Sequence, residues 1–297
     1  SDDIRFNESD GAVNYNAFKF GQYDNGWVND SYIRCYEGVR QASIMVNNVD
    51  INEELTKEEI LDKKAQARFL RAYFYWLLLR RYGPIPLIPD ETISIDETYT
   101  GMSYPRATYD EVVDYIDKEM TLAAKDLPDR RDRQNIARAT RGAALAVRAK
   151  ALLYSASPLN NPLPNDPDKF TDFVDDQGRI LMSQTYDESK WAKAAAAAKD
   201  VIDLGRYELH TADYQDKGDN TYPATVKPPY NAKYSNKNFP DGWANIDPFE
   251  SYRSIFNGDL YANENEELIF TRGNNYIGDQ VNHLVQNQMP TFAGGEN

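Results

Sequence analysis

The sequence is poor in the residues that most enzymes and metalloproteins rely on. Its 297 residues include one cysteine, Cys35, and two histidines, His210 and His283. A single cysteine excludes an intramolecular disulfide and a zinc site made of several thiolates. The local motifs of zinc proteases, serine hydrolases, P-loop proteins and dinucleotide-binding proteins are also absent. We therefore expect no catalytic residue, no metal site and no cofactor, and we expect Cys35 to be a buried structural thiol.

Positive charge and long apolar runs are also scarce. Lys and Arg number 33 against 47 Asp and Glu, which gives a formal net charge of −14 at pH 7. A general nucleic-acid binder needs positive potential to displace counterions, so we expect no nucleic-acid partner. The longest apolar run, residues 72–79, is far shorter than the ~20 residues that span a bilayer. The polar opening shows no signal peptide, and both ends of the chain suggest that it is a piece of a longer protein.

Aromatic residues, in contrast, are abundant, with 21 Tyr, 12 Phe and 4 Trp. A tyrosine or tryptophan ring offers a flat apolar face and a polar tip, which suits both helix packing and wet recognition surfaces. Many of these rings fall in two segments without helical periodicity, residues 14–30 and 222–243. Because composition alone does not separate the two roles, the position of each ring has to decide between them.

Apolar residues at spacings of three and four predict a series of amphipathic helices. Thr56 and Glu59 form a capping-box pattern at one helix start, and Gly83 followed by Pro84 predicts where that helix ends. A shorter helical piece is predicted at 252–257 and a strand at 267–272. The predicted helices cover about residues 27–49, 56–82, 108–127, 140–157 and 187–204.

The second predicted helix is apolar on nearly every side in its C-terminal half, so we expect helices around all of it. The aromatic residues expected in the core are Tyr73, Phe74, Trp76 and, in the fifth helix, Trp191. Consecutive antiparallel helices of similar length are typical of tetratricopeptide-type arrays. The sequence therefore predicts a mainly α fold of tetratricopeptide-like stacked helix pairs, with long irregular aromatic-rich loops and a few short strands.

Two long blocks resemble the signatures of a known family. Residues 64–88 read KAQARFLRAYFYWLLLRRYGPIPLI, and residues 138–158 read RATRGAALAVRAKALLYSASP. Both blocks, in this order and at this distance, are similar to those of the SusD/RagB family. The resemblance covers about residues 1–290, and it suggests one incomplete SusD-like domain over 1–297. Within it we expect a helical scaffold at about 27–205 and an irregular ligand-loop region at about 206–297.

The resemblance implies a non-enzymatic lipoprotein on the surface of a Bacteroidetes outer membrane. Such proteins bind oligosaccharides or polysaccharides for polysaccharide utilization and deliver them to a SusC-like TonB-dependent transporter. Cys35 falls inside a predicted helix and is not the lipidated residue, so the membrane anchor is implied by the family alone.

A sugar ring needs an aromatic platform for its C–H face and amide, carboxylate or guanidinium groups for its hydroxyls. Both irregular segments supply these residue types. In the family, loops in about these two regions contribute binding residues, although no motif fixes single positions. The candidate glycan-binding residues are Arg5, Tyr23, Asn25, Trp27, Asn29, Tyr234 and Trp243.

Two other functions remain open at the level of sequence. Stacked helix pairs form concave grooves, so the chain could instead be a peptide- or protein-binding scaffold of an uptake complex. An α-helical glycosidase would need two carboxyl groups about 5 to 10 Å apart across a cleft. The oxygen-rich stretch 213–220 lacks the order of an EF-hand loop, and we interpret it as a polar turn.

Overall fold

A computed structural model of the chain describes residue 21 and residues 31–90, 103–166, 170–216, 226–256, 260 and 265–270. The chain divides into two compact units, one made of residues 1–34 with 272–297 and the other of residues 35–271. Of the first unit, only Gly21 and residues 31–34 are described. The second unit contains the helical stack and the loops that are considered below.

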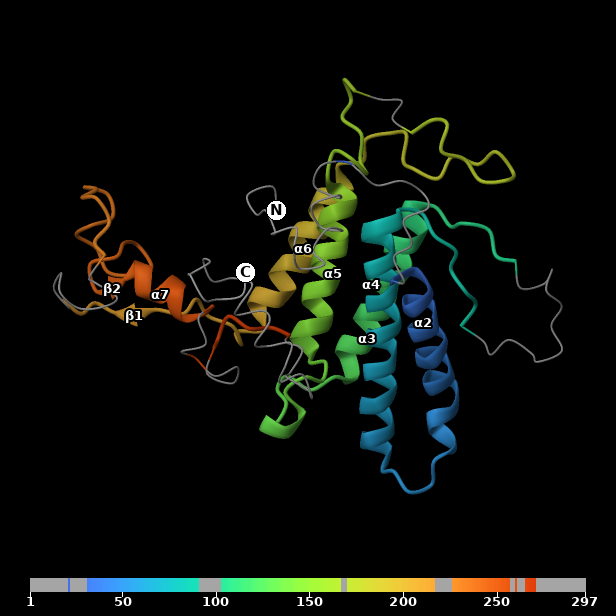
Figure 1. The fold of residues 1–297 in the computed structure, drawn as a ribbon, viewed down its shortest axis with the longest axis horizontal. Coiled ribbons are helices and arrows are strands. Elements are labelled where there is room, and N and C mark those ends of the chain that lie inside the picture. The colour runs from blue at the N-terminus through green and yellow to red at the C-terminus, as the bar shows by residue number, and fades with distance from the viewer. Residues whose placement is uncertain are drawn as a thin grey trace, which may run out of the picture. The chain divides into compact units, whose positions relative to one another are not determined.

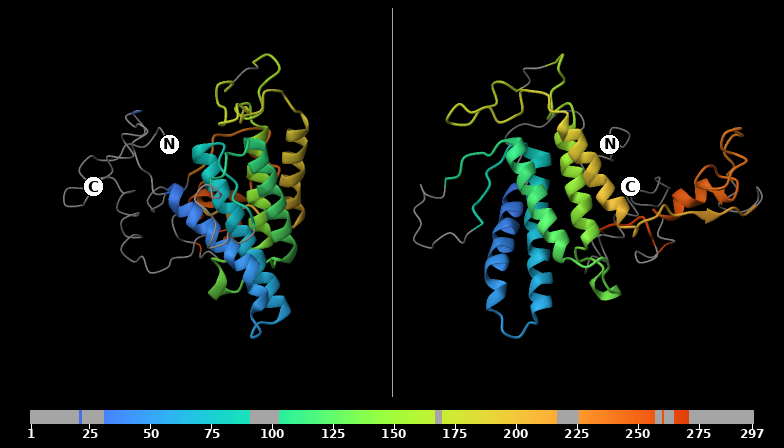
Figure 2. Two further views of the ribbon diagram at one scale, coloured as in Figure 1. Left: turned by 90° about the vertical axis from the view of Figure 1, so that its right-hand side faces the viewer. Right: turned by 180° about the vertical axis from the view of Figure 1, so that it is seen from behind.

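The second unit is built mainly from α-helices that follow one another along the chain (Figure 1). Helix α3 packs on α4, α4 on α5 and α5 on α6, so these four helices stack in the order of the sequence. Figures 1 and 2 show these helices side by side, which confirms the mainly α fold predicted from the sequence. The elements are α2 (Ser31–Asn48), η2 (Val49–Ile51), α3 (Lys57–Tyr82), α4 (Tyr109–Asp126), η3 (Arg133–Asn135), α5 (Arg141–Ala156), α6 (Ser189–Asp203), β1 (Ala212–Asp213), β2 (Ile246–Asp247) and α7 (Pro248–Ser254).

The helices begin and end where local chemistry favours it. The Thr56 side chain accepts a hydrogen bond from the Glu59 N–H, and the Glu59 carboxylate accepts one from the Thr56 N–H. Thr108 and Glu111 form the same capping box at the start of α4. Gly83 ends α3 with a φ of 67°, a left-handed value that costs glycine no Cβ clash.

The core is formed by the inward faces of α3, α4 and α5. Phe69 and Tyr75 of α3 are fully buried, and Trp76 is 3% exposed. Burial raises the pKa of Tyr75 to about 12, although its hydroxyl accepts a hydrogen bond from the Ile88 N–H. Cys35 is buried as expected, and burial raises the pKa of its thiol.

A buried ion-pair network crosses the core beside these apolar residues. Arg71, 1% exposed, lies 2.6 Å from the carboxylate of Glu119, and Arg68 approaches the same carboxylate at 2.9 Å. Arg71 also lies 3.2 Å from Asp90, whose carboxylate accepts a hydrogen bond from Tyr115. The network therefore joins α3 to α4 and to the extended segment that leaves α3.

Three predictions about the periphery of the fold are wrong. Trp191 is 40% exposed instead of buried, because it lies on α6, which packs only against α5 among the described helices. The last helix, α7, begins at Pro248, four residues earlier than expected, because Asp247 caps it. Residues 267–270 form no strand, since Asn265 accepts the N–H groups of Glu267 and Leu268 in a turn.

Candidate functional site

The candidate site is the aromatic loop, which we define as residues 230–245. Its C-terminal end is fixed by the antiparallel pair β1–β2, in which Ala212 faces Asp247. The Tyr214 N–H donates to the Asn245 carbonyl at 3.2 Å, one step beyond the strand pair. Ser251 of α7 accepts from the Ala212 N–H at 2.9 Å, so the loop's exit is attached to both neighbouring elements.

Turns within the loop bring together two residues that are nine positions apart. The Trp243 N–H donates to the Tyr234 carbonyl at 3.2 Å, and the Ala244 N–H donates to the Lys237 carbonyl at 2.8 Å. Gly242 makes this approach possible, because a Cβ atom there would overlap the carbonyl oxygens of Tyr234 and Lys237. The glycine is therefore required by close packing of backbone against backbone.

As a result, the rings of Tyr234 and Trp243 lie beside each other. Their centroids are 5.6 Å apart and their planes are inclined by 31°. Tyr234 is 36% exposed and Trp243 is partly buried, so both residues keep some accessible surface. The ammonium of Lys233 lies 4.9 Å from the centroid of the Tyr234 ring, within the range of a cation–π contact.

The polar side chains of the aromatic loop have two different roles. The Asn236 amide donates to the Tyr230 hydroxyl at 3.0 Å, and the Asn245 side-chain oxygen accepts from the Phe239 N–H at 2.8 Å. These two amides stabilise the loop itself. Asn238 and Asp241 are exposed, and neither side chain forms a hydrogen bond or ion pair with another described residue. Their amide and carboxylate groups are available for a ligand's hydroxyls.

A second contact between a cation and an aromatic ring joins a residue just after β1 to a residue just before the aromatic loop. The Lys227 ammonium lies 5.4 Å from the centroid of the Tyr214 ring and 3.6 Å from the Asp216 carboxylate. The hydrogen bond with Tyr214, followed by the charge of Asp216, raises the pKa of Lys227. Lys227 therefore carries a positive charge at neutral pH beside the loop's entry.

Two of the seven candidate binding residues predicted from the sequence, Tyr234 and Trp243, are thus described, and the structure brings them together. The pairing itself was not predicted, although the Asp241–Gly242 dipeptide before Trp243 is a recognisable turn signal. The stabilising roles of Asn236 and Asn245 had no sequence signal. The other five candidates lie outside the described residues: Arg5, Tyr23, Asn25, Trp27 and Asn29.

Within the described part of the chain, no three or more His, Cys, Asp or Glu side chains gather closely enough to hold a metal ion. The helices of the same part include none that combines the length and the apolar character of a membrane span.

Stacked helices joined to an irregular aromatic loop define a helical scaffold protein. Residues 5–153, half of the chain, match the family model described as "Starch-binding associating with outer membrane". The chain therefore belongs to this SusD-like family, as the two sequence blocks indicated.

Individual relatives agree with this assignment. SusD-like protein P25 of Formosa agariphila is 25% identical over 123 residues, which cover 41% of this chain and 23% of that protein. A SusD-like protein of Bacteroides ovatus is 27% identical over 189 residues, or 59% of this chain and 33% of that protein. The solved structure of BT4246 is 33% identical with a TM-score of 0.58, and the match covers 67% of this chain and 34% of that one. The chain thus spans about a third or less of the length of these relatives.

Proposed function

We propose that this chain is part of a non-catalytic glycan-binding protein whose aromatic loop holds sugar against Tyr234 and Trp243. The observation that carries the proposal is the ring pair, with its centroids 5.6 Å apart and with Tyr234 36% exposed. Two tilted rings can contact the C–H faces of a sugar chain, while Asn238 and Asp241 are free to bond its hydroxyls. The family description, which names starch binding, supports a glycan as the ligand.

The composition of the loop favours binding over hydrolysis. A glycosidase needs two carboxyl groups that face each other across the sugar. Asp241 is the sole carboxylate in the sequence of residues 230–245, where it accompanies four asparagines and two lysines. A single carboxylate can bond a pair of hydroxyls but cannot supply both the acid and the base of glycoside hydrolysis.

Isothermal titration of the chain with maltoheptaose, followed by a panel of soluble polysaccharides, tests this proposal. We expect Trp243→Ala and Tyr234→Ala each to weaken binding roughly tenfold or more, because each removes one stacking face. Tyr252→Ala is the matched control, since Tyr252 is 68% exposed on α7 and lies outside the loop. The proposal is wrong if no glycan on the panel binds, or if both loop variants bind like the control.

We further propose that the whole protein is a surface lipoprotein of the outer membrane that passes its glycan to a SusC-like TonB-dependent transporter. The family description, with its association with the outer membrane, supports the location. Copurification of the full-length protein with a SusC-like transporter from the same cells tests the partnership. Recovery of the full-length protein without any barrel protein under mild detergent would contradict it.

A further inference from the structure

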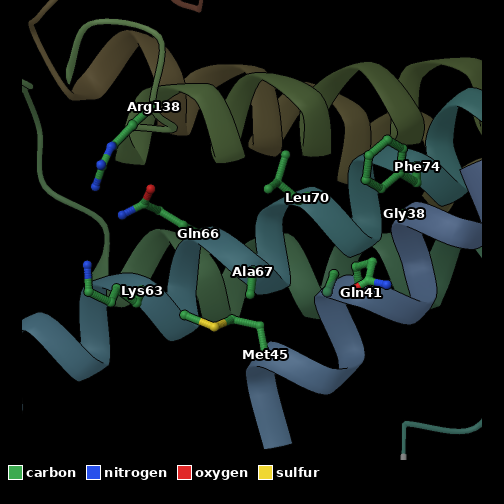
Figure 3. Close-up of a pocket in the computed structure, with 10 residues that line it drawn as sticks. Gly38, Gln41, Met45, Lys63, Gln66, Ala67, Leu70, Phe74 and Arg138 are labelled. Carbon is green, nitrogen blue, oxygen red and sulfur yellow. The ribbon is translucent and has the colours of Figure 1, made fainter. Parts of the chain in front are cut away.

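An apolar groove of about 460 Å³ runs between α2 and α3, on the helical stack and away from the aromatic loop in sequence (Figure 3). Ala42 and Ala67 are buried at its base, whereas Met45 and Leu70 are 38% and 43% exposed beside them. A Cβ atom at Gly38 would overlap the ring of Phe74, so the two helices approach closely at this end of the groove. The ten lining residues are Gly38, Gln41, Ala42, Met45, Lys63, Gln66, Ala67, Leu70, Phe74 and Arg138.

The lining residues follow the periodicity of the two helices. On α2 they fall at 38, 41, 42 and 45, and on α3 at 63, 66, 67, 70 and 74. Residues three, four and seven positions apart share one face of a helix, so each helix presents one continuous stripe to the groove. From Lys63 to Phe74, the stripe on α3 extends about 16 Å, which is the length of three helical turns.

The groove also has one basic end. Lys63 and Arg138 lie together with Gln66 at the end opposite Phe74, and none of the ten lining residues is acidic (Figure 3). Neither cation forms an ion pair within the described part of the chain, while the Gln66 amide already donates to Asp62. The lining itself is therefore positive at this end. Hydrogen bonds, and to a smaller extent the charges of Lys63 and Arg138, lower the pKa values of Glu59 and Asp132 nearby.

The groove is open because α3 is apolar on more sides than its neighbours cover. The face of α3 that carries Phe69, Ala72 and Trp76 is buried in the core. Among the described residues, its other apolar stripe, with Leu70 and Phe74, shares the groove with α2 and Arg138. In stacked helix arrays each helix pair contacts its neighbours, and an end pair exposes the stripe that an inner pair would bury. The groove is such an uncovered stripe.

We infer that this groove binds an amphipathic α-helix of a partner protein, with carboxylates at the end of that helix beside Lys63 and Arg138. Two parallel stripes about three turns long match the i, i+3, i+4 and i+7 side chains of a helix laid between them. The basic end, whose lining residues include no carboxylate, fixes the direction of the helix through charge. The inference concerns different residues from the glycan proposal and does not depend on it.

A fluorescein-labelled amphipathic peptide of about 14 residues, with leucines at helical spacing and two glutamates at one end, is the probe. Its affinity is measured by fluorescence anisotropy for the whole chain and for variants with unchanged circular dichroism. We expect Leu70→Gln to weaken binding about tenfold, because it removes a central apolar contact. Leu61→Gln is the matched control, since Leu61 is 49% exposed on the same helix but does not line the groove.

Charge reversal tests the direction of the helix. The double variant Lys63→Glu with Arg138→Glu should bind the glutamate peptide about tenfold more weakly than the wild-type chain does. It should bind more tightly a peptide in which lysines replace the two glutamates. Lys57→Glu, outside the groove on α3, should change neither affinity. Equal effects of Leu70→Gln and Leu61→Gln, or equal binding of both peptides to the wild-type chain, would overturn the inference.

Two other occupants are distinguishable outcomes that would also overturn it. If dodecanoate binds more tightly than the peptide with the same dependence on Leu70 and Arg138, the groove holds an anionic amphiphile instead. If the chain alone self-associates in sedimentation velocity and Leu70→Gln makes it monomeric, the groove is occupied by a second copy.

Discussion

Helix α3 and the aromatic loop hold their shapes by opposite means. Helix α3 is held by its side chains, because Phe69 is fully buried, Trp76 is 3% exposed and Arg71 is paired with Glu119 inside the core. The loop is held by its backbone and amides, and it leaves its rings accessible, with Tyr230 71% exposed. Substitutions in α3 should therefore change mainly stability, whereas substitutions in the loop should change mainly recognition.

The largest expected effect comes from removing the buried carboxylate of the network. Glu119→Ala leaves Arg71 in the core without its partner at 2.6 Å, so we expect the free energy of unfolding to fall by about 3–5 kcal/mol. Urea denaturation followed by circular dichroism measures this change.

Two controls isolate the role of burial in that result. Asp200→Ala removes a partner of Arg148 that is 52% exposed, and it should cost under about 1 kcal/mol. Glycan affinity of the folded Glu119→Ala fraction should stay unchanged, because the network does not touch the loop. A loss below ~1 kcal/mol for Glu119→Ala would show that the network is not the stabilising element we describe.

The second prediction tests the loop side of the comparison. In Gly242→Ala the new methyl group would overlap two backbone oxygens, so the turn that joins Trp243 to Tyr234 must open. We expect glycan affinity to fall about tenfold or more, or ~1.4 kcal/mol, in isothermal titration. The unfolding midpoint should change little, since the core is untouched.

Ala232→Ser is the control for the loop variant. Ala232 is exposed, so a small added hydroxyl should fit there without displacing the loop. It should bind glycan like the wild-type chain. If Gly242→Ala keeps full affinity, the close approach of Trp243 to Tyr234 is not needed for binding.

The same comparison explains which features the sequence could predict. The bounds of α3 and α4 depend on neighbouring residues, such as the Thr56 capping box and Gly83, so pattern analysis located them within one or two positions. The two SusD-like blocks lie on helices as well, the first on α3 and the second on α5. The loop depends on contacts between separate positions, such as Asn245 with the Phe239 N–H, and no periodic pattern encodes them.

The wrong prediction for Trp191 has a related physical origin. Helical periodicity marks Trp191 and Leu70 as apolar positions, but it does not tell which neighbour covers them. Both are about 40% exposed, at 40% and 43%, because the described helices leave these faces of α6 and α3 open. The helical spacing of the apolar residues that line the groove can be found in the sequence. That these residues are exposed is known only from the fold.

The smallest expected effect concerns the capping box of α4, where local chemistry alone acts. Thr108→Ala should cost about 1 kcal/mol of unfolding free energy, the usual value of an N-cap side chain. The pKa of Glu111 is lowered below its ordinary value of ~4.3. The largest cause is the hydrogen bond from the Thr108 N–H, and the Thr108 hydroxyl and the charge of Arg179 contribute less. A carboxyl group whose pKa is lowered by folding stabilises the folded chain at pH values above its unfolded pKa. This stabilisation is lost as the pH falls through the folded pKa.

Urea denaturation of Glu111→Gln at a series of pH values measures this contribution. The wild-type chain should be the more stable at pH 7, and the difference should disappear at pH values well below 4. Arg179→Ala separates the capping hydrogen bond from the exposed ion pair at 3.0 Å, and it should remove only a small part of the difference. A difference that persists unchanged at low pH would mean that Glu111 acts through packing and not through its charge. Glycan affinity should be the same for all three chains at pH 7, because the box stabilises the scaffold and lies outside the loop.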